Sequence, residues 1–234
     1  MIKLYVYPPA MGFPSPSPFC MKLMVWFKLT GLHHTVEYTS MPLSAPKKKL
    51  PYIDHDGDII GDSSLIIEYL CKRFPEAAAL DRSLKPEQRA TGLAFQRLIE
   101  EHLYWSLVYS RWAVDENWEQ TRADFFGQMP PVVNRVVPVI ARRQALAQLD
   151  GHGMGRHSME EIYNMALADI QSISDFLGRN SFFLGSKPTG IDATVYAFLA
   201  QAAMAPIESP MKTAINADKR LVAYIERMHK TTGL

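Results

Sequence analysis

The stretch that most constrains the fold is residues 50–70, LPYIDHDGDIIGDSSLIIEYL. Asp56 and Gly57 form a hairpin turn signal between two short runs of residues that favour β-strands. Asp62 and Ser63 then precede an apolar helical run, and short polar side chains in that place typically cap the start of a helix. The stretch therefore predicts a strand, a tight turn, a second strand and a helix.

Two features of the same stretch suggest ligand binding. Pro51 stands at the start of a strand, where no ladder donor is lost, and a cis Leu50-Pro51 bond would turn the Leu50 backbone toward a ligand. The free N–H groups of a helix that begins at Asp62 and Ser63 attract an anion such as a carboxylate. A hairpin and an ordinary helix cap explain the same residues without a ligand, and on spacing alone that simpler interpretation is favoured.

Properties of the whole chain exclude several classes of protein. The 234 residues suit one large or two modest domains, and a net charge of +1 gives no overall field for nucleic acid or an anionic membrane. The two cysteines, Cys20 and Cys71, argue against a disulfide framework, and the seven histidines show no metal-ligand spacing. The sequence shows neither a secretory signal nor an apolar run long enough to cross a bilayer, so we expect a soluble, cytoplasmic protein without a metal.

The N-terminal part predicts a βαβ unit ahead of this stretch. Residues 2–7 alternate between apolar and polar side chains, which is typical of a strand. Residues 8–18 contain five prolines and exclude regular structure up to Ser17 and Pro18, a strong helix start. A second strand follows at residues 36–39. Together with the hairpin and its helix, this predicts a βαβ-ββα half.

The rest of the chain predicts helices joined to that half by a polar linker. Residues 88–112 carry apolar side chains at helical spacing, and residues 118–149 are also mostly helical. We expect residues 150–155, which are rich in glycine, to form a flexible connection. We expect interruptions of the second helical region at Pro130, Pro131 and Pro138.

Two capping boxes mark the starts of later helices. Ser158 and Glu161 form one, and Thr189 and Asp192 form the other with an aspartate in place of the usual glutamate. A last helix includes residues 221–228. We interpret Asp192 as a folding cap and not as a catalytic group.

This order of elements resembles the cytosolic glutathione transferase family over essentially the whole chain. The motif that carries the resemblance is Leu50-Pro51, the hairpin, Asp62, Ser63 and a helix. Residues 100–112 and 182–192 look more like the branch with the failed-axon-connections and metaxin-like proteins. The resemblance implies a thioredoxin-like α/β domain at residues 1–80, a linker at 81–86 and an all-helical domain at 87–234.

The resemblance also implies roles for the motif residues. In this family the proline is cis, and the residue before it, here Leu50, pairs its backbone with the cysteinyl part of glutathione. The acidic residue and serine, here Asp62 and Ser63, hold the γ-glutamyl end. Glutathione is then a co-substrate, and a homodimer is expected.

Ser17 is our candidate for the group that activates the thiol. A free thiol has a pKa of about 8.5, and a hydroxyl donor at a helix N-terminus favours the thiolate. Ser17 also occupies the position of the first cysteine in a glutaredoxin CPxC motif, although it is equally suited to capping the helix. Ser15 and Tyr7 are rival donors because the proline-rich loop is long. Cys20 is either a resolving thiol or, more often for a lone cysteine, part of the core.

Three lysines precede the proline. Lys47, Lys48 and Lys49 form a solvated loop in the simpler interpretation, and in the alternative Lys49 contacts the glycyl carboxylate of glutathione. We do not assign the aromatic residues of the helical half to a site, because aromatic side chains at helical spacing usually form core.

The sequence thus leads to two hypotheses. In the first, the chain is an enzyme that activates the glutathione thiol for attack on a small apolar electrophile or a peroxide. In the second, it is a non-catalytic module of the same fold that binds glutathione or a protein. Retained motif residues favour the first hypothesis, and the uncertain identity of the hydroxyl donor favours the second.

Overall fold

The computed structural model describes residues 1–40 and 45–234. Its N-terminal half contains a four-stranded sheet in the described residues, with the order β2-β1-β3-β4. β1 and β2 are parallel, whereas β1 and β3, and β3 and β4, are antiparallel. The predicted βαβ-ββα arrangement is confirmed, and the strands are β1 (Ile2–Val6), β2 (Thr35–Tyr38), β3 (Tyr52–His55) and β4 (Asp58–Gly61).

Both helices of this half begin at the predicted caps. α1 (Pro18–Thr30) follows Ser17, whose Oγ accepts a hydrogen bond from the Cys20 backbone N–H at 3.4 Å. α2 (Ser63–Arg73) follows Asp62, which accepts from the first turn of the helix. The proline-rich loop before α1 is irregular as predicted, apart from a two-residue bridge between Ala10 and Phe13.

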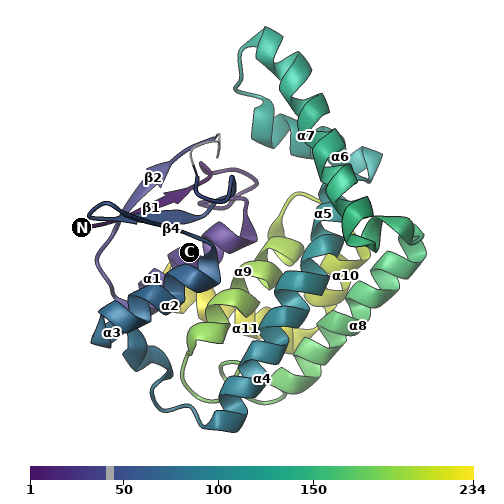
Figure 1. The fold of residues 1–234 in the computed structure, drawn as a ribbon. Helices are drawn as coiled ribbons and strands as arrows, with labels where there is room; N and C mark the ends of the chain where they lie inside the picture. Colours follow the sequence, from purple (N-terminus) through teal and green to yellow (C-terminus); the bar gives the residue numbers. More distant parts are fainter. Residues whose placement is uncertain (41–44) are drawn as a thin grey trace.

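The remainder of the described chain is helical and lies beside the sheet (Figure 1). From residue 87 on, the described residues contain no strand, only an isolated bridge between Phe182 and Gly185. The predicted helix at residues 88–112 is continuous but includes a π-helical segment, η3. The elements are α3 (Pro75–Ala78), η2 (Ala79–Asp81), α4 (Pro86–Arg97), η3 (Leu98–Leu103), α5 (Tyr104–Trp112), α6 (Asp115–Phe126), α7 (Pro131–His152), η4 (Met154–Arg156), α8 (Met159–Leu177), α9 (Gly190–Met204), α10 (Pro210–Ala217) and α11 (Lys219–Thr232).

Two sequence predictions about α7 were wrong. Pro138 lies inside the helix and does not interrupt it. Proline removes one helical hydrogen bond, but contacts with the preceding helices hold α7 in place: Arg142 donates to the Trp112 carbonyl at 2.8 Å and lies over the Trp118 ring. Residues 150–152 continue α7 instead of forming a flexible connection, and the helix ends at Gly153, whose φ of 102° suits a glycine cap.

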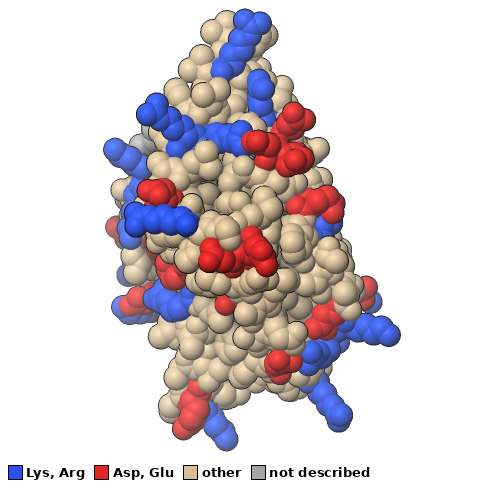
Figure 2. Space-filling model, turned by 90° about the vertical axis from the view of Figure 1, so that its right-hand side faces the viewer, with Lys and Arg blue, Asp and Glu red and all other residues tan. Residues whose placement is uncertain are grey.

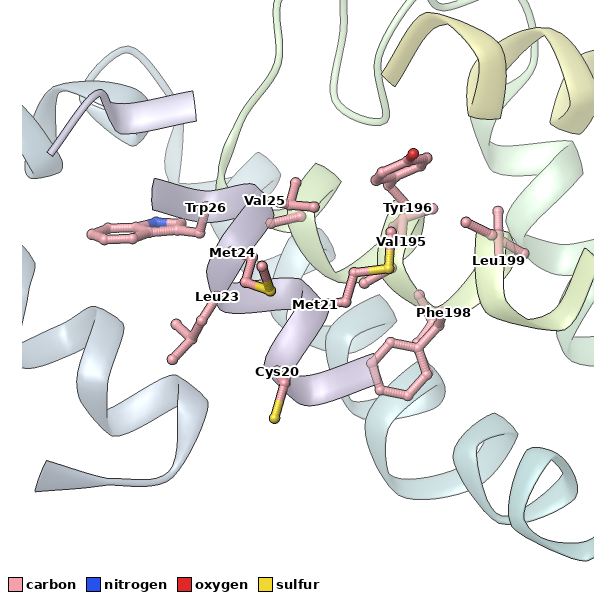
Figure 3. Packing of buried hydrophobic residues seen from close by; sticks show 14 of the residues in the cluster. Cys20, Met21, Leu23, Met24, Val25, Trp26, Val195, Tyr196, Phe198 and Leu199 are labelled. Atoms are coloured by element: carbon pink, nitrogen blue, oxygen red, sulfur yellow. The ribbon is translucent and has the colours of Figure 1, made fainter. Parts of the chain in front are cut away.

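The two halves share one hydrophobic core built around α1 and α9. Every residue of α9 from 191 to 203 is buried, which explains why its sequence shows little amphipathic pattern. Figure 3 shows Met21 and Val25 of α1 directed toward Val195 and Tyr196 of α9, with Cys20 directed away from α9. The start of α1 is therefore fixed by the helical half as well as by the sheet.

The predicted cap of α9 is a buried hydrogen-bonded centre. The Asp192 carboxylate accepts from the Thr189 N–H at 2.8 Å, the Thr189 hydroxyl at 2.9 Å and the Phe183 N–H at 2.7 Å. The Tyr224 hydroxyl donates to the same carboxylate at 2.9 Å. Asp192 is thus saturated by structural contacts, in agreement with its interpretation as a folding cap.

Candidate active site

The strand register brings the predicted site residues to one edge of the sheet. Tyr5 of β1 pairs with Tyr52 of β3, and Tyr52 pairs with Gly61 of β4. The segments just beyond these pairs, which hold Tyr7, Leu50-Pro51 and Asp62, therefore leave the sheet at the same edge. α1 also begins there, because a helix joining the parallel strands β1 and β2 must run back along the sheet.

The Leu50-Pro51 bond is cis, as the resemblance implied. Leu50, which lies two residues before β3, is buried, whereas Lys47, Lys48 and Lys49 are exposed. Their exposure fits the interpretation of a solvated loop. A contact of Lys49 with a ligand stays a prediction.

The start of α2 presents a carboxylate and two hydroxyl groups. Asp62 is exposed, and its Oδ1 accepts from the N–H groups of Ser64 at 2.9 Å and Leu65 at 3.1 Å. Ser63 is buried, and its Oγ accepts a hydrogen bond from Lys22 Nζ at 3.1 Å. Because Lys22 donates to this oxygen, the Ser63 hydroxyl proton is left to donate to a ligand.

Lys22 was missed by the sequence analysis, and it is the centre of a buried network under α2. Its Nζ forms an ion pair with Glu100 Oε1 at 2.6 Å and also donates to Ser64 Oγ at 3.1 Å. Together with the bond to Ser63 Oγ, these contacts use all three protons of the ammonium group. Burial lowers the pKa of Lys22, and the adjoining Glu100 carboxylate opposes that shift.

The network joins the two halves of the protein. Gln96 donates to Ser64 Oγ at 2.8 Å and to Glu100 Oε2 at 3.0 Å, and Thr194 of α9 donates to Glu100 at 3.3 Å. A cavity of about 250 Å³ between α2, α4 and α9 is lined in part by Lys22, Ser64, Gln96 and Thr194. Glu100 lies in the π-helical segment η3, and such segments are frequent at functional sites.

All three candidate hydroxyl donors lie near the start of α1. The Cys20 thiol lies beside the Ser15 and Ser17 side chains and the Tyr7 backbone. Ser15 is fully buried, and its Oγ makes no hydrogen bond of regular geometry in the described structure. Burial raises the pKa of Tyr7 to about 12, so its hydroxyl stays protonated and able to donate. The structure brings Ser17, Ser15 and Tyr7 together without choosing between them.

Cys20 is expected to be inert at neutral pH. Burial raises the pKa of its thiol to about 11, and the hydrogen bonds from Tyr7, Ser17 and Ser15 offset only part of this shift. Because the thiolate is the reactive form, alkylation should be slow until the pH approaches 11 or the protein unfolds. Mass spectrometry after iodoacetamide treatment of native and denatured protein measures this. Rapid labelling of Cys20 in the native protein at pH 7 would support a redox role instead.

The described residues contain neither a candidate metal cluster nor a candidate membrane-spanning helix. No group of three or more His, Cys, Asp or Glu side chains there is arranged to hold a metal ion. No helix in that part of the chain has the length and apolar character needed to cross a membrane. On the face shown in Figure 2, basic and acidic side chains are interspersed with uncharged surface.

Comparisons with known proteins show the family of this chain. Models of the glutathione S-transferase N-terminal domain and the glutathione S-transferase C-terminal domain match residues 18–118 and 166–228. The isoprene-epoxide–glutathione S-transferase of Rhodococcus sp. (strain AD45) is 40% identical over 98% of each chain. The chain belongs to the glutathione transferase family. The predicted resemblance is confirmed.

Other relatives confirm the predicted branch. Failed axon connections of Drosophila melanogaster is 31% identical over 86% of this chain, which spans 50% of that protein. Metaxin-1 of Mus musculus is 30% identical over 89% of this chain, which spans 67% of that protein. A solved glutathione S-transferase of Ceriporiopsis subvermispora, in complex with glutathione, has a TM-score of 0.67 at 18% identity and covers 98% of this chain and 97% of its own. At that identity the likeness shows the glutathione transferase fold alone.

Proposed function

We propose that this glutathione transferase activates the glutathione thiol for attack on a small apolar electrophile, and that an epoxide is its natural class of substrate. The observation that carries the proposal is the meeting of three features at one sheet edge: the cis Leu50-Pro51 bond, the α2 N-terminus and the hydroxyl groups at the start of α1. The choice of an epoxide rests on the likeness to the Rhodococcus enzyme. A cytoplasmic homodimer is the form expected from the family and is part of the proposal.

Each part of glutathione has a proposed partner. The Leu50 backbone pairs with the cysteinyl part, and Lys49 contacts the glycyl carboxylate. Asp62 holds the γ-glutamyl ammonium group, and the free proton of Ser63 is donated to the γ-glutamyl carboxylate. The free N–H groups of α2 support the same carboxylate.

The proposed reaction is a substitution at an epoxide carbon. Ser17 Oγ accepts from the Cys20 N–H, and in this proposal its own proton turns from the neighbouring Cys20 thiol to the glutathione sulfur. The thiol proton passes to solvent, and the thiolate forms a C–S bond while the C–O bond of the epoxide breaks. The released alkoxide takes a proton from water. Ser15 and Tyr7 remain the rival donors.

Removal of either polar group at the α2 start should weaken glutathione binding. Asp62→Ala and Ser63→Ala each remove a contact to a charged group, so we expect a loss of about 1.5–3 kcal/mol. Asp62→Asn is the cleaner test of charge, because Asn tolerates the positive φ of 86° and still accepts at the helix cap. Glu68→Ala, an exposed charge farther along α2, is the matched control. Titration calorimetry with unchanged affinity in the Asp62 and Ser63 variants would remove these residues from the site.

Turnover tests the proposal itself. The purified chain is mixed with glutathione and a small epoxide, and the conjugate is measured by mass spectrometry, with a hydroperoxide as the second substrate class. The proposal requires epoxide conjugation that Ser63→Ala impairs. The similarity to failed axon connections and metaxin-1 favours the alternative of a non-catalytic module, which would bind glutathione without forming either product.

A further inference from the structure

Residues 15–17 hold two of the candidate hydroxyl donors. Side chains of the helical half fix this segment by hydrogen bonds to its backbone. Arg111 of α5 donates from Nη1 to the Pro16 carbonyl at 2.8 Å and from Nη2 to Gln201 Oε1 at 2.9 Å. Gln201 of α9 in turn donates to the Ser15 carbonyl at 3.0 Å. Arg111 and Gln201 thus form a clamp on two successive backbone carbonyls of this segment.

Arg111 is a buried cation that no described carboxylate pairs with. Only 7% of the residue is exposed, and both of its acceptors are neutral oxygens. Burial lowers the pKa of its guanidinium to about 10, which still leaves it charged at neutral pH. Buried charges in proteins are normally paired, and a cation kept without a partner needs another source of stabilisation.

The other titratable groups facing this segment are neutral at pH 7. They are Tyr7 at the end of β1, Cys20 of α1 and Tyr104 of α5, and burial raises the pKa of each, to about 12 for Tyr7 and about 11 for Cys20. Phe19, which follows the segment, packs edge-on against Tyr104 at 4.9 Å between ring centroids and keeps α5 against this end of α1. With three neutral acids and one cation, the surroundings of the segment carry a net positive charge.

Ser15 is fully buried in the same segment, and its side chain lies against the Cys20 thiol. The segment that Arg111 and Gln201 hold is therefore enclosed as well as clamped.

We propose that Arg111 is a positioning residue for thiol activation: it holds residues 15–17 through the Pro16 carbonyl, and its charge favours the thiolate of glutathione bound there. This inference rests on the proposed function, because it assigns the anion that balances Arg111 to the sulfur of glutathione. Arg111 acts through the segment and through its charge and makes no proposed contact with the epoxide.

The test compares the loss of charge with the loss of the clamp. Arg111→Met removes both, Arg111→Lys keeps the charge but not the planar fork, and Gln201→Met removes the second arm of the clamp while Arg111 stays. The pH at which bound glutathione ionises is followed by thiolate ultraviolet absorbance. In parallel, binding of glutathione and S-methylglutathione, which cannot ionise, is measured by calorimetry.

We expect Arg111→Met to raise the pKa of the bound thiol by about one unit, which is a tenfold loss of thiolate at neutral pH. S-methylglutathione affinity should change much less than glutathione affinity in this variant. Arg111→Lys keeps the charge and Gln201→Met loosens only one carbonyl of the clamp, so each should raise the bound-thiol pKa by much less than Arg111→Met does. If Arg111→Met does not fold, the test rests on Arg111→Lys, which keeps the charge. A bound-thiol pKa that rises by about one unit in Arg111→Lys overturns the role of the charge.

The outcomes separate this inference from the proposed function. An Arg111→Met variant with a wild-type bound-thiol pKa overturns the inference while the proposed function stands. A wild-type protein that binds glutathione without lowering its thiol pKa overturns both.

Discussion

Lys22→Met lowers the free energy of unfolding by about 3–5 kcal/mol, because it leaves Glu100 buried and charged without its partner. The Lys22 side chain is only 2% exposed and that of Glu100 only 4%, so water cannot replace the lost contact. The substitution also removes the donor that fixes the Ser63 hydroxyl. Denaturant unfolding of the wild type and the variant measures the change.

Two further variants isolate the ion pair. Lys72→Met breaks an exposed pair with Glu68 and should cost less than about 1 kcal/mol. The double variant Lys22→Met with Glu100→Leu replaces both charges by apolar groups and should recover most of the lost stability. A single Lys22→Met variant that loses no more than the Lys72 control would show that the buried pair does not form.

Ser17→Ala shifts the pH–rate profile of conjugation upward by about one pH unit, because the variant loses one hydrogen bond to the thiolate while the α1 terminus stays, and each unit corresponds to about 1.4 kcal/mol. The shift is upward because loss of the Ser17 hydroxyl raises the pKa of the bound thiol. The reactive thiolate then forms only at higher pH. Glutathione affinity should change little, because the proposed binding contacts lie at Leu50, Asp62 and Ser63.

The rival donors provide the controls for this experiment. Ser15→Ala and Tyr7→Phe are measured side by side with Ser17→Ala, at a temperature where all three are folded, because Ser17 also caps α1. A shift confined to the Ser15 or Tyr7 variant assigns the donor to that residue and contradicts our assignment.

The parts of the fold that the sequence predicted are those set by local chemistry. Asp56 and Gly57 have φ values of 53° and 99°, the conformation that a two-residue hairpin turn requires. Ser17 and Asp192 cap helices through bonds that reach only a few residues along the chain or to the neighbouring loop. Such signals need no knowledge of the tertiary structure.

The parts that the sequence did not predict depend on contacts between distant residues. Lys22 is a buried charge in the middle of a mostly apolar helix, and its partner Glu100 lies 78 residues away. Arg111 meets Pro16 across 95 residues, and only the docking of the helical half brings them together. A charged residue inside an otherwise apolar run is a usable signal for Lys22, but it does not identify the partner.

At Pro138 the prediction from local sequence was wrong, because tertiary contacts override the local effect of the proline. The proline rule predicts an interruption, yet α7 continues because its side chains are held by α5 and α6 on the far side of the proline. Residues 150–152 are likewise drawn into the helix, with Met154 buried just beyond its end. Tertiary packing decides both cases.

The central claim is that the sheet edge at Ser17 ionises the thiol of bound glutathione. A titration of the wild-type chain saturated with glutathione, followed by thiolate ultraviolet absorbance against a titration of free glutathione, tests it most directly. We expect the bound thiol to ionise about one to two pH units below the free thiol. Bound glutathione that ionises at the same pH as free glutathione would contradict the account and identify the chain as a binding module.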